Sequence, residues 1–251
     1  AAYNNAGDNV VALGVGAAYA NVASGDHVNA VGYEAAFRNS GESVNAVGYQ
    51  AGRHNIGDQV NAVGYQAAMF NTKGNVTAIG YQAARNNTAF DVIATGSDAA
   101  YSNSGRNVIA LGHGAAYSNT GFDVIATGTQ AARFNTARGA IAIGNAAGFR
   151  NSGLELVATG SGAAHRNTGD YVVASGTNVA YANTGDYVAA SGFGAARSNT
   201  GDHVLATGAH AAYANTGDDV VATGSTAAYN NAGDNVVALG VGAAYANVAS
   251  G

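Results

Sequence analysis

The chain has 251 residues, of which only 10 % are charged, and its net charge of −5 disfavours a surface that binds nucleic-acid phosphates. It contains 37 Gly but no Cys, Pro or Trp, which excludes disulfides, thiolate metal sites and a cysteine nucleophile. No apolar run is long enough for a membrane-spanning helix, so we expect no membrane insertion. Ala and Val make up most of the hydrophobic 47 %, which is poor material for one large globular core.

A 16-residue repeat runs through the whole sequence. A typical unit is AAYANTGDDVVATGST at 211–226, and positions are counted here from its first Ala. Position 5 is always Asn, position 12 is always Ala and position 14 is always Gly. One unit is longer because residues 22–25 replace the usual Thr-Gly, and residues 1–25 are identical to residues 227–251. We therefore expect one repeat domain over 1–251, cut from a longer tandem array.

The repeat length predicts the fold class. A unit of 16 residues is too short for a pair of helices but suits one coil of a β-solenoid. Positions 10–14 read V-x-A-x-G, so alternation along a strand would turn positions 10 and 12 inward and positions 11 and 13 outward. Thr-Gly-Asp at positions 6–8 is typical of a turn. We predict an all-β, parallel β-solenoid (β-roll) of about fifteen 16-residue coils. Each coil would hold two short strands, the second beginning at the Ala-Ala pair.

Stacked coils would bring equal repeat positions into columns along the solenoid axis. The Asn residues at position 5 then form a ladder in which side-chain amides bond from coil to coil or to the turn backbone. Eight members of this structural ladder are Asn103, Asn119, Asn135, Asn151, Asn167, Asn183, Asn199 and Asn215.

The outward strand positions are often apolar, as at Ile109, Leu111, Ile141 and Ile143. An apolar stripe along one side of a solenoid needs cover, so we expect lateral self-association, most simply as a parallel homotrimer. The alternative is that Val and Ile at these positions only express β-propensity on an exposed face.

Three segments carry a family resemblance. VNAVGYQA at 44–51 and 60–67 and VTAIGYQA at 76–83 are similar to the NTAIGYQAG repeats of phage tail fibres and bacterial surface proteins. They also resemble the V-A-I-G repeats in the head of YadA-type trimeric autotransporter adhesins, although the period here is longer and later units read V-V-A-T-G. The resemblance implies a left-handed, usually trimeric β-roll that serves as an extracellular stalk or adhesive head on a virion or cell surface.

Five Asp residues at position 8 of consecutive units would form an acidic row: Asp170, Asp186, Asp202, Asp218 and Asp234. Like charges stacked on successive coils repel unless they are screened or bridged. Calcium bound between turns would relieve the repulsion, because hard cations bind carboxylate oxygens. The alternative is a solvated turn, since Asp is a common turn residue and the calcium-binding nonapeptide is absent.

Position 3 holds mainly Tyr and Arg, which include Tyr181, Arg197, Tyr213 and Tyr229. Arg at this position excludes an interior column, so we expect an exposed ridge. Such a ridge could contact surface glycans, or it could pack between neighbouring solenoids.

A column of hydroxyl groups occupies position 13 of five consecutive units, at Thr159, Ser175, Ser191, Thr207 and Thr223. A flat hydroxyl array could order water and bind ice, although position 11 supplies no second hydroxyl column. The alternative is an ordinary outward strand position.

No pattern of catalytic residues is found, and the six His residues do not stack on adjacent coils. We therefore expect a structural fibre or filament segment rather than an enzyme. This segment would associate with other copies laterally or end to end and would need no cofactor. An adhesin-type glycan-binding module is the alternative, and ice binding is a third.

Overall fold

The computed structural model describes residues 1–21 and 26–248, so the predicted insert at 22–25 lies outside the described residues. Fifteen parallel strands of three or four residues are formed, one in each full sequence repeat, and the described residues contain no helix. Their bounds are β1 Val11–Leu13, β2 Asn29–Val31, β3 Val44–Val47, β4 Val60–Val63, β5 Val76–Ile79, β6 Val92–Thr95, β7 Val108–Leu111, β8 Val124–Thr127, β9 Ala140–Ile143, β10 Leu156–Thr159, β11 Val173–Ser175, β12 Ala189–Ser191, β13 Leu205–Thr207, β14 Val221–Thr223 and β15 Val237–Leu239.

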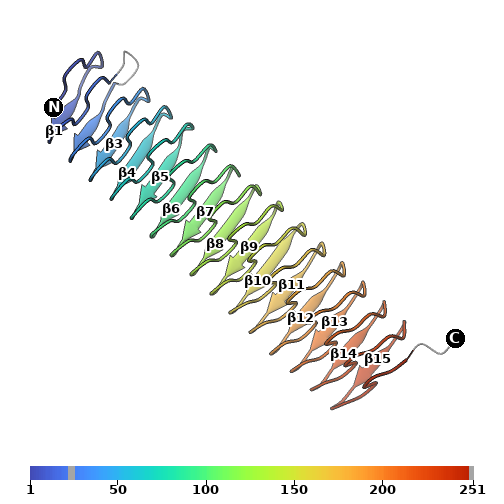
Figure 1. Cartoon of the computed structure of the whole chain (residues 1–251). Helices are drawn as coiled ribbons and strands as arrows, with labels where there is room; N and C mark the ends of the chain where they lie inside the picture. Colours follow the sequence, from blue (N-terminus) through green and yellow to red (C-terminus); the bar gives the residue numbers. More distant parts are fainter. Residues whose placement is uncertain (22–25, 249–251) are drawn as a thin grey trace. The chain divides into compact units, whose positions relative to one another are not determined.

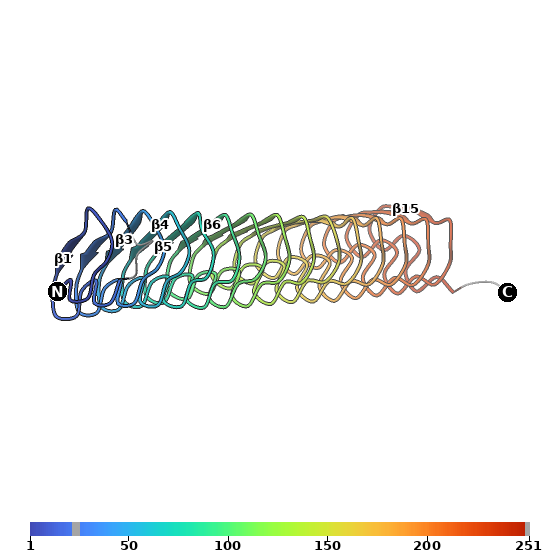
Figure 2. The ribbon, with the colours of Figure 1, turned by 90° about the horizontal axis from the view of Figure 1, so that it is seen from above.

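The chain divides into two compact units, Ala1–Thr127 with β1–β8 and Gly128–Gly251 with β9–β15. Within each unit the strands lie side by side in chain order (Figure 1), and Figure 2 shows the successive coils from above. Pairing is parallel and keeps repeat positions in register, so that Ala46 pairs with Ala62 in the first unit. Ala174 likewise pairs with Ala190 in the second unit. The prediction of an all-β parallel solenoid with 16-residue coils is confirmed.

The prediction of two strands per coil is wrong. The wall that begins before the Ala-Ala pair is a run of turns, as at residues 49–54, where Gln50, Gly52 and His54 have φ of 54°, 60° and 54°. Alternation of left-handed and right-handed residues turns successive peptide groups up and down the stack. The Ala36 N–H therefore donates to the Ala51 oxygen of the next coil at 2.8 Å. These bonds offset a left-handed cost of roughly 1–2 kcal/mol for each non-Gly residue.

The interior is built from small side chains. Val at position 10 and Ala at positions 1, 2 and 12 are buried in nearly every coil, as at Val108, Ala110, Ala115 and Ala116 with no exposed surface. The outward positions 11 and 13 are exposed or half-buried in each strand, as the alternation predicts. Apart from Leu156, methyl groups of Ala and isopropyl groups of Val fill the space between the two walls, so the coil is thin.

Gly at position 14 ends every strand. Gly48 has φ of 130°, a conformation that is strained for any residue with a side chain. A Cβ atom there would lie 2.5 Å from the carbonyl oxygen of Gly64 in the next coil. The turn geometry and the close approach of coils together explain why no other residue occupies this position.

Candidate functional site

The Asn column forms a continuous ladder within each unit, and its buried members have at most 1 % exposed surface. Asn103 Nδ2 donates to Asn87 Oδ1 at 3.1 Å, and Asn119 Nδ2 donates to Asn103 Oδ1 at 2.9 Å. The second proton of Asn103 Nδ2 reaches the carbonyl oxygen of Gly105 at 2.8 Å. Each amide therefore joins its own turn to the preceding coil.

The second unit repeats this arrangement. Consecutive Nδ2–Oδ1 bonds of 2.9–3.0 Å connect five of the predicted ladder residues to their neighbours, namely Asn151, Asn167, Asn183, Asn199 and Asn215. The Asn135 amide lies at the start of this series and donates to the Ala137 oxygen at 2.8 Å. The asparagine ladder is confirmed as a structural element, and its polar atoms are directed to each other rather than to a ligand.

The acidic row is formed, and each carboxylate binds the backbone of the preceding coil. Asp186 Oδ1 accepts the Asp170 N–H at 2.8 Å, and Asp202 Oδ1 accepts the Asp186 N–H at the same distance. Asp218 and Asp234 continue the pattern at 2.8 Å and 3.0 Å. One oxygen of each carboxylate is thus used within the fold, which leaves the second oxygen to face outward.

The Tyr/Arg ridge is half-buried because its side chains stack on one another. Tyr213 and Tyr229 have ring centres 4.8 Å apart with an interplanar angle of 5°. The Arg197 guanidinium lies over the rings of Tyr181 and Tyr213, at 5.1 Å and 5.9 Å from their centres. The ring faces are therefore covered by neighbouring side chains, and only the ring edges and hydroxyl groups face solvent.

The same ridge becomes strongly basic near the start of the second unit. Phe149, His165 and Tyr181 form one stack with ring centres 4.8 Å apart. Arg150 and Arg166 stand beside this stack at position 4 and are exposed. Burial and the neighbouring Arg166 and Arg150 cations hold the pKa of His165 below its ordinary value of 6.5. Burial is the larger cause of this shift, and the two Arg cations add to it.

The outward face of the strands carries exposed apolar side chains. Ile93, Ile109 and Ile125 follow one another at position 11 of β6–β8, with 44 %, 36 % and 38 % of their surface exposed. A hollow of about 390 Å³ lies against Ile93 and Ile109 on this face. The predicted hydroxyl column of the second unit is also exposed, with Thr207 paired in register with Thr223.

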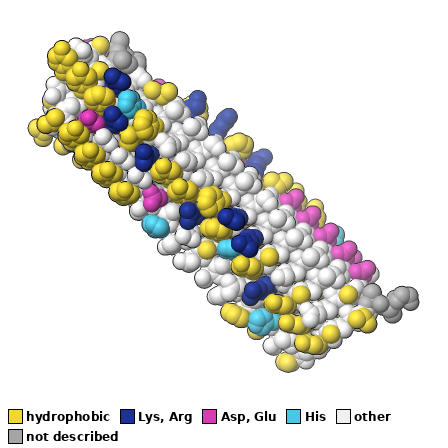
Figure 3. All heavy atoms as spheres, in the orientation of Figure 1, with side chains coloured by type: hydrophobic (Ala, Val, Ile, Leu, Met, Phe, Trp, Pro, Cys, Tyr) yellow, Lys and Arg dark blue, Asp and Glu magenta, His cyan; other side chains and the backbone are white. Residues whose placement is uncertain are grey.

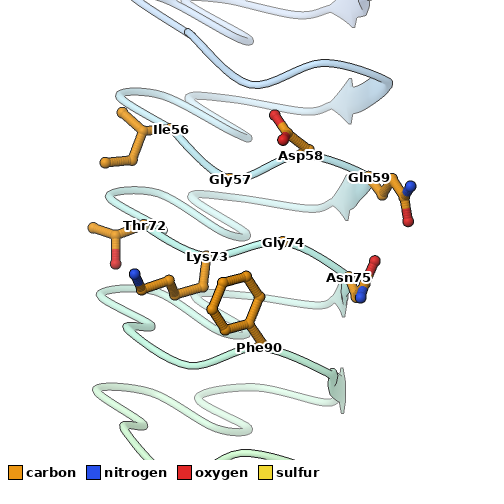
Figure 4. A pocket seen from close by; sticks show the side chains of 9 residues that line it. All are labelled: Ile56, Gly57, Asp58, Gln59, Thr72, Lys73, Gly74, Asn75 and Phe90. Carbon is orange, nitrogen blue, oxygen red and sulfur yellow. The ribbon is translucent and has the colours of Figure 1, made fainter.

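A second hollow of about 310 Å³ opens on the turns that precede β4, β5 and β6 (Figure 4). Gly57 and Gly74 are among its lining residues, and Lys73 extends toward the ring of Phe90 at 5.2 Å. The only carboxylate in its lining is Asp58, which already accepts the Glu42 N–H at 2.9 Å. The hollow therefore brings together no set of groups that could carry out a reaction.

Sequence reasoning did not predict two further ladders. Asn29, Asn45 and Asn61 bond through their amides at 2.8 Å on the outward face of β2–β4. Gln66 Nε2 donates to Gln50 Oε1 at 2.8 Å, and Gln50 Nε2 donates to the carboxylate of Glu34 at 2.9 Å. Both ladders are visible in the sequence as equal residue types at a spacing of 16.

Among residues 1–21 and 26–248, no group of three His, Asp or Glu side chains could hold a metal ion. The described part of the chain contains no helix that could cross a lipid bilayer. Neither a protein-family model nor a curated protein matches the chain.

Proposed function

We propose that this chain is a structural module of an extracellular or surface-attached fibre, such as a stalk, surface filament or tail-fibre shaft. The observation that carries the proposal is the unbroken series of coil-to-coil bonds within each unit, in which every strand pairs in register and every turn is joined by an Asn amide. Such a structure grows in length by adding coils without changing its interior. The resemblance of residues 44–83 to fibre and surface-protein repeats supports the same function.

We propose further that copies associate laterally through the outward strand face, most simply as a parallel homotrimer. Exposed Ile93, Ile109 and Ile125 form a continuous apolar stripe on β6–β8. Parallel sheets usually have both faces covered, because burial of apolar surface contributes roughly 25 cal/mol of stabilisation per Å². A second copy offers the same stripe at the same spacing.

Glycan binding by the ridge is the second candidate. Sugars stack on open aromatic faces, but the faces of Tyr213 and Tyr229 cover each other. The Tyr hydroxyl groups and Arg197 remain as hydrogen-bonding groups, which favours contact with polar or charged partners over stacking with a neutral sugar.

Sedimentation equilibrium and electron microscopy test the lateral association. We expect the wild-type protein to sediment as a species of three times the 24.6 kDa mass of one chain and to form rods in electron micrographs. Replacement of Ile93, Ile109 and Ile125 together by Thr should weaken association at least about tenfold, because it removes apolar surface and keeps β-branching.

A matched control changes the same repeat position where it is polar. Asn45→Thr with Asn61→Thr should leave the oligomer mass unchanged, because these residues contribute no apolar surface. A wild-type chain that remains monomeric, or a triple Thr variant that associates as tightly as wild type, would contradict the proposed interface.

A further inference from the structure

Charge is segregated along the second unit. Residues 128–166 contain four Arg and one Glu, for a net charge of +3, whereas residues 167–251 contain one Arg and six Asp, for a net charge of −5. The proposed apolar stripe does not use these charges, since they lie at positions 3, 4, 8 and 9 rather than on the strand. Figure 3 shows a row of acidic side chains along one edge of the visible face, apart from basic side chains nearer its middle.

The positive end of this unit is a basic patch, defined here as Arg133, Arg150 and Arg166. A backbone hydrogen bond places Arg150 beside Arg133 of the preceding coil. The Arg150 N–H donates to the Arg133 carbonyl oxygen at 2.8 Å. Arg150 lies over the ring of Phe149 at 5.6 Å, which orients its guanidinium. Arg150 and Arg166 are exposed, and neither forms an ion pair with a described residue.

The negative end is the acidic row from Asp170 to Asp234. Each carboxylate uses one oxygen to accept an N–H of the preceding coil, as Asp202 does from Asp186, so the side chain is held in place with its second oxygen outward. None of the five carboxylates forms an ion pair within the described residues. Two unit charges about 5 Å apart repel by roughly 0.8 kcal/mol even in water, so the unpartnered row opposes the stacking of its own coils.

We propose that the basic patch of one copy docks on the acidic row of a second copy. Both sets of charges follow the same coil repeat, in which neighbouring side chains such as Phe149 and His165 are 4.8 Å apart. Guanidinium groups on successive coils therefore meet carboxylates on successive coils in register. The contact relieves the repulsion within each row.

The two surfaces differ, so the contact is heterologous. The docked pair keeps one free basic patch, on one copy, and one free acidic row, on the other, so further copies add without limit. This inference rests on the proposed structural function and gives it a second, charge-dependent contact that extends an assembly beyond the apolar interface.

Two variants test the contact. The first is Arg150→Gln with Arg166→Gln, and the second is Asp186→Asn, Asp202→Asn and Asp218→Asn, in which the amide oxygen still accepts the backbone N–H. Sedimentation velocity is measured at about 0.01 M and about 1 M salt, where the Debye length falls from about 30 Å to about 3 Å. Circular dichroism confirms that both variants fold.

At low salt we expect wild type to form species larger than the apolar oligomer, and each variant alone to associate about tenfold more weakly. An equal mixture of the two variants should recover one productive contact, between the intact acidic row of the first and the intact basic patch of the second. The contact in the mixture therefore joins a chain of the first variant to a chain of the second, and never two chains of the same variant. High salt should abolish all of these species.

Four results would overturn the inference. One is association of the single variants at the wild-type level, and another is a mixture that behaves like its separate components. The third is unchanged self-association of the Arg variant together with lost retention on an acidic polysaccharide such as heparin, which would assign the patch to a ligand. Association that resists salt but is lost in the triple Ile→Thr variant would overturn only this contact and leave the lateral interface intact.

Discussion

The coils at residues 28–63 and those at residues 172–223 bury the same residue types but expose different ones. Both bury Val at position 10, Ala at position 12 and Asn at position 5, as at Val60 and Asn55 in one region and Val204 and Asn199 in the other. The inward pattern is thus independent of what the surface carries.

The outward sides of these two regions have different chemistry. In residues 28–63 the strand face carries an Asn ladder, and Tyr33 and Tyr49 stack with ring centres 5.1 Å apart. In residues 172–223 the same strand positions hold Val, Ala or Leu beside Ser or Thr, and the turns carry the acidic row. This comparison indicates that the buried side chains specify the fold, while function depends on the columns of outward-facing side chains. Substitutions inside should therefore act alike in both regions, and substitutions outside should not.

The largest expected effect is at position 14. Gly208→Ala and Gly48→Ala should each lower the free energy of unfolding by at least about 4 kcal/mol, since Cβ would lie 2.7 Å or 2.5 Å from the next coil's carbonyl oxygen. Denaturant unfolding monitored by circular dichroism measures the loss. Gly242→Ala is the control, because a Cβ there would meet nothing within 4 Å and Ala146 already occupies the equivalent left-handed position, and it should cost about 1 kcal/mol. Unequal losses for Gly208 and Gly48 would contradict a shared interior.

The next effect concerns the ladder amides. Asn199→Ala removes the bonds of Asn199 to Asn183 and Gly201 and the bond that Asn215 donates to it, so buried polar atoms lose their partners. We expect a loss of about 3 kcal/mol. Hydrogen exchange should show that the loss is concentrated in the adjoining coils.

The matching change in the other region is Asn55→Ala, which removes equivalent bonds to Asn39 and Gly57. It should cost the same within about 0.5 kcal/mol. The exposed neighbour Ser198→Ala is the control and should change stability by less than about 0.5 kcal/mol. A loss no greater than that of the control would show that the amides contribute little.

A smaller effect should separate the two regions. Asp186→Asn, Asp202→Asn and Asp218→Asn together remove neighbouring like charges but keep the N–H acceptor. We expect the monomer to gain about 1 kcal/mol at low ionic strength and nothing at about 1 M salt, where the charges are screened. Thermal unfolding at dilute protein concentration measures the gain.

Asp58→Asn provides the comparison from residues 28–63, where only Glu42 adjoins it on the preceding coil and Gly74 follows on the next. It should change stability less than the triple variant does. A gain in the triple variant that persists at high salt would show that repulsion is not its cause.

Much of this structure could be predicted from the 16-residue period. The period places equal residues in columns, and the inward alternation of Val108 and Ala110 and the bonding of Asn103 to Asn119 both follow from it. The second wall could not be predicted in this way. Buried Ala68 and Ala84 adopt φ of 49°, which Ala rarely does, because bonds to neighbouring coils stabilise a conformation that the isolated chain disfavours.

The candidate surfaces were only partly predictable. The spacing placed Asp186 and Asp202 in one row and Tyr213 and Tyr229 in one ridge, but it could not show that Asp202 accepts a backbone N–H or that the Tyr faces close on each other. Those facts depend on side-chain rotamers and on the exact offset between coils. They change the chemistry, since they leave one carboxylate oxygen and the ring edges for partners.

The smallest effect concerns pH and should appear in both units. The pKa of His165 is lowered by burial and by Arg166 and Arg150, and that of His54 by burial and by Arg53 and Arg38. Since the folded state prefers the neutral ring, each histidine contributes stability that is present above pH 6.5, its ordinary pKa, and is lost as pH falls through the lower folded value.

His165→Tyr isolates one of these contributions. The substitution keeps an aromatic ring between Phe149 and Tyr181, which both stack on His165 at 4.8 Å, and removes the titrating group. The wild type should lose at most about 1 kcal/mol relative to the variant between pH 7.5 and pH 5, because part of the ring is solvated. Parallel pH profiles of the two proteins would show that burial and the neighbouring Arg cations do not lower the pKa of His165 in the folded state.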